Sequence, residues 1–71
     1  MDRSAAQEIS TLMLEYGAKL DASVTLVTAH SHSEEGDRYR KAVGHIMGVM
    51  LTEIMNPLYK EHPDLKPRQL K

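Results

Sequence analysis

The second half of this chain carries a wide apolar stripe at helical spacing, and this stripe constrains the fold more than any other feature. Its members are Tyr39, Val43, Ile46, Met47, Met50, Leu51, Ile54, Met55 and Leu58. That spacing places them on one side of an α-helix. The stripe is wider than the seam between two coiled helices, so we expect it to contact more than one neighbouring helix. A helical bundle provides several such neighbours, whereas an isolated hairpin provides one.

A long helix is also predicted over residues 4–30. Ser4 followed by Gln7 is the signature of a capping box. The apolar residues that follow recur at helical spacing. They are Ile9, Leu12, Met13, Tyr16 and Leu20, with Leu14 off the stripe.

Residues 21–30 stay open between helix and strand. The segment from Ser23 to Thr28 is rich in β-branched side chains, which favour strands. We favour the helix because a lone strand has no partner within one chain. A break between Gly17 and Ser23 is the main alternative to a continuous helix, since a glycine inside a helix costs up to about 1 kcal/mol relative to alanine.

Residues 30–37 form the predicted connection, because they combine Ser, Gly and Asp with no large apolar side chain. Ser33 is the expected N-cap of a second helix over residues 34–55, and Asp37 is the alternative cap. Two helices joined by so short a connection are expected to pack antiparallel.

The pair Asn56-Pro57 is expected to kink or end the second helix near Met55. Proline inside a helix removes a hydrogen bond and clashes with the preceding turn. Two further prolines are expected to keep the end of the chain extended. We therefore predict an all-α fold, with an antiparallel helical hairpin over residues 1–63 and an extended tail over residues 64–71.

The chain has 71 residues and no cysteine. A domain this small is marginal alone, and the usual supports are disulfides, a metal or a partner subunit. The lack of cysteine excludes disulfides, thiolate metal sites and thiol catalysis. We expect a homodimer in which two hairpins form a four-helix bundle, with Leu65 of the tail in a groove of the other subunit. We expect no cofactor.

The expected contact surface lies on the second helix. Gly44 and Gly48 remove side chains from one patch of its surface and Thr52 extends this patch, so another helix can cross closely there. The expected dimer or partner face consists of Met47, Met50, Leu51, Ile54, Met55 and Leu58. Methionine-rich surfaces of this kind adapt to varied partners.

Histidine and carboxylate side chains provide a weaker candidate site. His30, His32 and Glu34 surround the predicted connection and carry atoms that bind metal ions. A rival function, a small metal-binding protein or enzyme, would combine these histidines with His45 and Glu53 across a subunit interface. No Ser-His-Asp or paired-carboxylate arrangement is evident, so a non-enzymatic role is favoured.

Charge is unevenly distributed, although the net charge is only −1. Residues 1–36 carry two basic and six acidic side chains, and residues 37–71 carry seven basic and four acidic ones. We expect these halves to face each other, within the hairpin or between subunits. Nucleic-acid binding through Arg38, Arg40 and Lys41 is a third class of function, but such proteins normally show a clear basic excess.

No stretch of the sequence approaches the roughly 18–20 apolar residues that span a bilayer, and the first residues do not form a secretory signal. We therefore expect a cytoplasmic protein that does not enter a membrane. The function that these features favour is a small protein-binding or regulatory module that acts through homo-oligomeric helical association.

Overall fold

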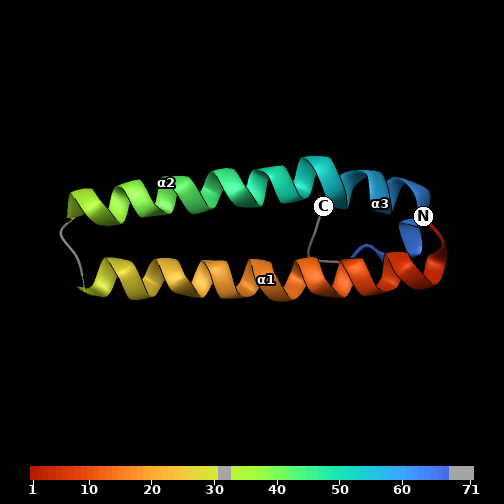
Figure 1. Ribbon diagram of the computed structural model, residues 1–71, viewed down its shortest axis with the longest axis horizontal. Coiled ribbons are helices and arrows are strands. Elements are labelled where there is room, and N and C mark those ends of the chain that lie inside the picture. The colour runs from red at the N-terminus through yellow and green to blue at the C-terminus, as the bar shows by residue number, and fades with distance from the viewer. Residues whose placement is uncertain (31–32, 68–71) are drawn as a thin grey trace.

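The computed structural model describes residues 1–30 and 33–67. Two long helices lie side by side and antiparallel, and the chain then continues through three shorter helical segments (Figure 1). In order, the elements are α1 (Arg3–His30), α2 (Ser33–Val49), the π-helix η1 (Met50–Met55), α3 (Asn56–Glu61) and the 3-10 helix η2 (Pro63–Leu65). The described residues contain no strand, so the predicted all-α hairpin is confirmed. It measures 44 × 19 × 16 Å.

Helix α1 has the predicted length, but its N-cap lies earlier than expected. The Asp2 carboxylate accepts a hydrogen bond from the Ala5 N–H at 2.8 Å, which is the role of an N-cap side chain. Ser4 lies inside the helix, so the predicted capping box is wrong. The helix continues to His30 without a break at Gly17, and residues 21–30 are helical.

Gly36 of α2 is buried against α1 beside the connection. A Cβ at Gly36 would lie 3.1 Å from Cγ2 of Thr28 and 3.5 Å from its Cα. The absent side chain therefore lets the two helices meet directly beside the connection. Helix α2 has Ser33 as its first helical residue, one position earlier than predicted, so an N-cap role for Ser33 stays a prediction. Asp37 lies inside the helix, so the alternative cap is excluded.

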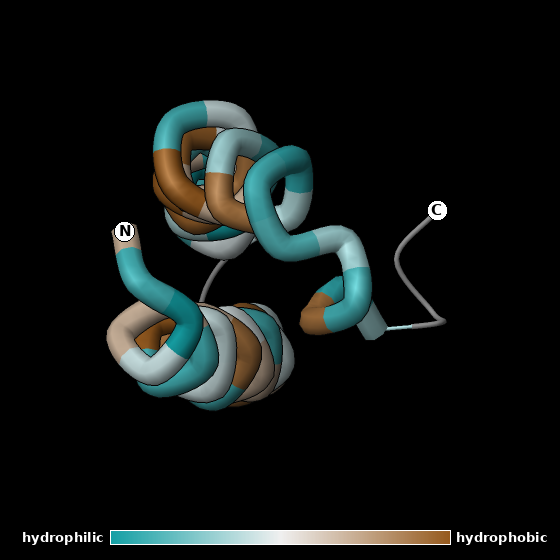
Figure 2. The backbone as a smooth tube through the Cα atoms, turned by 90° about the vertical axis from the view of Figure 1, so that its right-hand side faces the viewer, coloured by the Kyte–Doolittle hydropathy of each residue, from teal (hydrophilic) through white to brown (hydrophobic). Residues whose placement is uncertain are grey.

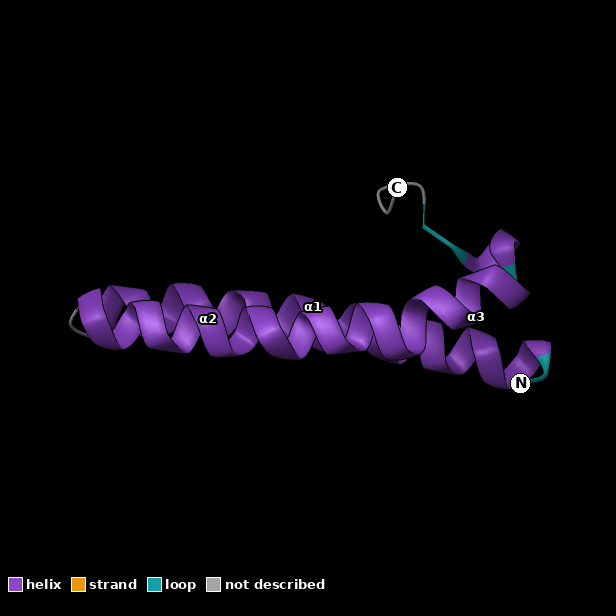
Figure 3. Ribbon diagram, turned by 90° about the horizontal axis from the view of Figure 1, so that it is seen from above, coloured by secondary structure: helices purple, strands orange, loops and turns teal. Residues whose placement is uncertain are grey.

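The chain remains helical across Pro57, so of the two expected outcomes near Met55, an end or a kink, only the kink is observed (Figure 3). The helix widens to a π-helix over Met50–Met55, and the Asn56 N–H donates to the carbonyl of Leu51, five residues back. In an α-helix the proline ring would clash with the carbonyl four residues before it. The wider turn relieves this clash, and α3 then bends away from the line of α2 (Figure 3).

The main hydrophobic core is small and joins η1 and α3 to the start of α1, at the end of the hairpin that faces the viewer in Figure 2. It consists of Ala6, Met55, Leu58 and Tyr59, with Ile9, Met13 and Leu65 packed against it. Val43 is buried nearer the connection, outside this cluster. The apolar stripe predicted from the sequence therefore contributes only part of its residues to the core of one chain.

Two tyrosine hydroxyls join α1 to the second half of the hairpin. The Tyr59 hydroxyl and the buried Ser10 hydroxyl are 2.6 Å apart and share a hydrogen bond. Ser23 donates to the Leu20 carbonyl at 2.6 Å, and the Tyr39 hydroxyl lies 2.7 Å from the Ser23 oxygen. Because the Ser23 proton is used on Leu20, Tyr39 donates in the second contact.

Replacing Tyr59 with phenylalanine is expected to lower the free energy of unfolding by about 1 kcal/mol, because it leaves the Ser10 hydroxyl buried without this partner. Urea unfolding followed by circular dichroism measures the change. The double variant Ser10→Ala with Tyr59→Phe removes both hydroxyls, so it should regain part of the loss. A double variant that is no more stable than Tyr59→Phe would contradict this role for the pair.

The end of the described chain folds back on its own hairpin. Leu65 packs against the core cluster, and Arg3 of α1 forms an ion pair with Asp64 of η2. We expected Leu65 in a groove of another subunit and an extended tail from residue 64. Both expectations are wrong for residues 64–65, because η2 turns Leu65 onto the chain's own core. Residues 68–71 lie outside the described residues.

Candidate functional site

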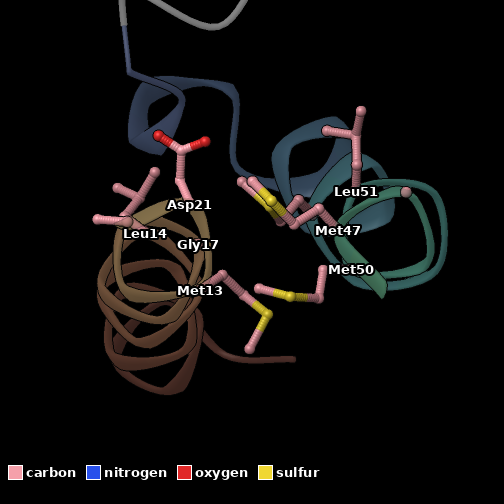
Figure 4. Close-up of a pocket in the computed structure, with 10 residues that line it drawn as sticks. Met13, Leu14, Gly17, Asp21, Met47, Met50 and Leu51 are labelled. Carbon is pink, nitrogen blue, oxygen red and sulfur yellow. The ribbon is translucent and has the colours of Figure 1, made fainter. Parts of the chain in front are cut away.

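An apolar groove of about 750 Å³ runs between α1 and the second half of the hairpin (Figure 4). From α1 it is lined by Met13, Leu14, Gly17, Ala18 and Asp21. From α2 and η1 it is lined by Met47, Gly48, Met50, Leu51 and Met55. Asp21 is the only charged residue among these ten. The groove can therefore contact an apolar surface that carries a cation at one edge.

The floor of the groove is built from methionine side chains opposite a glycine. A Cβ at Gly17 would lie 3.8 Å from Cε of Met47, an ordinary van der Waals distance, so the tip of Met47 lies directly beside the glycine. Met13, Met47 and Met50 are half-buried, and Met47 and Met50 project into the space between the helices (Figure 4). Unbranched methionines change shape at little cost, which makes this floor adaptable.

The rim of the groove is exposed on both helices. Leu14 is 41% exposed and Leu51 is 39% exposed, and both side chains point outward at the mouth of the groove, as does Asp21 (Figure 4). Leu14 lies off the apolar stripe of the sequence, and Asp21 belongs to none of the sites predicted from the sequence. An apolar residue off the stripe, four residues before the small Ala18, was the available signal for this second contact face.

The predicted dimer or partner face is divided by the fold. Met55 and Leu58 are buried in the core of their own chain. Met47 and Met50 form the groove floor, and Leu51 lies on its rim. Ile54 lies in a second, smaller hollow of about 350 Å³ near Pro57. A partner can therefore reach the groove residues and Ile54 but not the core pair.

The predicted glycine patch is not used within the hairpin. A Cβ at Gly44 or at Gly48 would meet no heavy atom within 4 Å, and Thr52 donates a hydrogen bond to the Gly48 carbonyl at 2.9 Å. A helix crossing at this patch therefore stays a prediction for a second chain. The glycine that is buried between the two helices of one chain is Gly36, which lies three residues before Tyr39 of the apolar stripe.

The candidate metal ligands are not assembled within the described part of the chain. His30 ends α1 and Glu34 lies in the first turn of α2, on a different helix, while His32 lies outside the described residues. His45 and Glu53 are both exposed. No group of three or more His, Asp or Glu that could hold a metal ion occurs within residues 1–30 and 33–67.

The described ion pairs concentrate at the open end of the hairpin. The hydrogen bond from the Arg3 guanidinium lowers the pKa of the Asp64 carboxyl, and the hydrogen bond from the N-terminal ammonium lowers the pKa of Glu61. Arg40 pairs with Asp37 inside α2 at 2.9 Å. Among the described residues, the predicted facing of an acidic half and a basic half thus produces no ion pair between α1 and α2.

No protein-family model, curated protein or solved structure matches this chain. Any functional inference must therefore come from its own residues and geometry. None of the helices in residues 1–30 and 33–67 has the length and apolar character needed to cross a membrane.

Proposed function

We propose that this chain is a small non-enzymatic association module that acts as a homodimer, with two hairpins forming a four-helix bundle. The observation that carries the proposal is the amount of surface that one chain leaves exposed. The accessible surface is 5486 Å², whereas a compact monomer of 8.0 kDa exposes about 4,450 Å². The excess reflects the elongated hairpin, 44 × 19 × 16 Å, which exposes enough surface to contribute the ~800 Å² that each partner provides to a standard interface.

The distribution of apolar side chains supports the same proposal. The buried apolar residues of the described chain are Ala6, Val43, Met55, Leu58 and Tyr59. Nine large apolar side chains are exposed, among them Leu14, Ile46, Leu51 and Ile54. Disulfides are excluded by the lack of cysteine. A second copy is therefore a natural means of covering this apolar surface in so small a domain.

The lining of the groove favours binding over catalysis. Asp21 is the single titratable group among the lining residues. Catalysis by a side-chain nucleophile commonly uses an adjacent base within hydrogen-bond reach that activates it. An apolar groove with one rim carboxylate lacks such a pair and fits a protein surface instead.

Sedimentation equilibrium of the full chain, at micromolar to millimolar concentrations, tests this proposal. We expect a mass twice the 8.0 kDa of one chain and a melting temperature that rises with concentration, because the second copy stabilises the folded state by mass action. The mass of a single chain at every concentration, together with cooperative melting that is independent of concentration, would overturn it.

A further inference from the structure

One exposed ridge from each helix borders the groove. On α1 the ridge residues are spaced by four and three positions, and they are Leu14, Ala18 and Asp21. On the second helix the spacing is three, four and three, and the residues are Lys41, Gly44, Gly48 and Leu51. Gly48 and Leu51 line the groove, whereas Gly44 and Lys41 continue the same ridge beyond it, toward the connection. Such spacings place each set on one side of its helix. The resulting face is apolar or small at its centre, with an acid on one ridge and a base on the other.

This face suits a second copy of the same chain, so the inference rests on the proposed function. The elongated hairpin exposes enough surface to contribute one partner's share of a standard interface. Within the described residues, neither Asp21 nor Lys41 belongs to an ion pair. A two-fold interface presents the same patch from both subunits, so each chain can supply the cation for the other's Asp21.

Two contacts inside the hairpin fix the register of its helices. The Cβ position of Gly17 lies beside Met47, and that of Gly36 lies beside Thr28. In both pairs the two residue numbers add up to 64. Residue n of α1 therefore lies at the same height along the hairpin as residue 64 − n of α2.

A two-fold axis parallel to the helices stacks α1 of each chain on α2 of the other and preserves these levels. Asp21 is then level with Val43 of the partner subunit, two residues or about 3 Å along the axis from Lys41. Ala18 is level with Ile46 of the partner subunit, midway between the two glycines of the patch. The small Ala18 side chain therefore lies against the glycine patch of the partner's α2, where no side chains project.

A two-fold axis perpendicular to the helices gives a different bundle, in which α1 stacks on the partner's α1. The ridge of α1 contains Leu14, Ala18 and Asp21 and no cation. Each Asp21 carboxylate would then enter an apolar interface without a positive partner from the facing ridge. Removing an ionised carboxylate from water without such a partner is strongly unfavourable, so charge selects the first arrangement.

We infer that two copies pair groove to groove with α1 of each chain on α2 of the other, which places Asp21 against Lys41 of the partner subunit. The dimer then has two symmetric ion pairs at the edges of an apolar, glycine-lined centre. The dimer is specific for a second copy because the acid lies on α1 and the base on α2, so each chain supplies the partner that the other lacks.

Charge reversal tests the pairing in the full chain. Asp21→Lys alone and Lys41→Glu alone are each expected to weaken the dimer about tenfold, because each places like charges at two symmetric sites. Mixing the two single variants, or combining both changes in one chain, should restore the dimer. Lys19→Glu is a matched control, because Lys19 is exposed and lies two residues before Asp21, about 200° around α1 from it; it should leave the dissociation constant unchanged.

Cysteine crosslinking provides an independent measurement, since the native chain has no cysteine. A mixture of Ala18→Cys and Gly48→Cys chains should form a disulfide between unlike chains, and Ala18→Cys alone should not crosslink. A wild-type dimer in which Ala18→Cys crosslinks to itself, or in which the charge pair fails to restore binding, would overturn the pairing and leave the proposed function standing. A wild-type monomer would overturn both.

Discussion

Leu58→Ala is expected to lower the free energy of unfolding by about 2–5 kcal/mol, the usual cost of removing a buried leucine side chain. Leu58 is 5% exposed and packs with Ala6, Met55 and Tyr59. This cluster holds α3 against the first turns of α1. Because so few large side chains are buried in one chain, no neighbouring core can compensate for the cavity.

Thermal and urea unfolding at a fixed protein concentration measure this effect. Leu26→Ala is the matched control, because Leu26 is 62% exposed and substitutions at such sites change stability by about 0.5 kcal/mol or less. Equal effects of the two substitutions would show that the cluster around Leu58 does not hold the hairpin together.

The sequence predicted the helices well because their apolar periodicity extends over many turns. The prediction of 4–30 compares with the observed α1 at Arg3–His30. The ambiguity over residues 21–30 could not be resolved from local propensity. In the hairpin Val24 and Val27 are half-buried as parts of a helical face, so packing against the second half of the chain outweighs their preference for strands.

The π-helix could not be predicted, because the apolar residues Leu51 and Ile54 hide the five-residue spacing that would indicate it. The buried or half-buried positions in this region are Met47, Met50, Met55 and Leu58, and the five-residue step from Met50 to Met55 spans the π-helix. Leu51 and Ile54 are also apolar, and they complete an ordinary helical pattern. Only the structure shows that these two residues are exposed, so the sequence alone suggested a proline kink.

The candidate site was half predictable. Sequence reasoning named the residues on one wall of the groove, such as Met47, Gly48 and Leu51, because they belong to a strong stripe. It missed the opposite wall of Leu14 and Asp21, because these residues lie off the stripe of α1. A groove between two helices depends on how the helices are rotated against each other, and that rotation is set by Gly36 and by the small core rather than by either pattern alone.

Gly48→Leu is expected to weaken the dimer and to lower the melting temperature, with a cost of about 1–3 kcal/mol from overpacking. Within one chain nothing lies within 4 Å of a Cβ at this position, so the hairpin itself has room for the new side chain. The cost arises only where a second chain lies against the glycine patch. In a free monomer the same change would instead stabilise α2 by close to the ~0.8–1 kcal/mol helix penalty of glycine.

The sign of the melting shift therefore reports whether another helix covers this face. Ala42→Leu is the matched control, because Ala42 is exposed and lies two residues before Gly44, about 200° around the helix from it. It should leave the mass and the melting temperature nearly unchanged. Stabilisation by Gly48→Leu with an unchanged dimer mass would place the dimer interface on another face of the hairpin, since a leucine cannot be added without cost where two helices cross on a glycine.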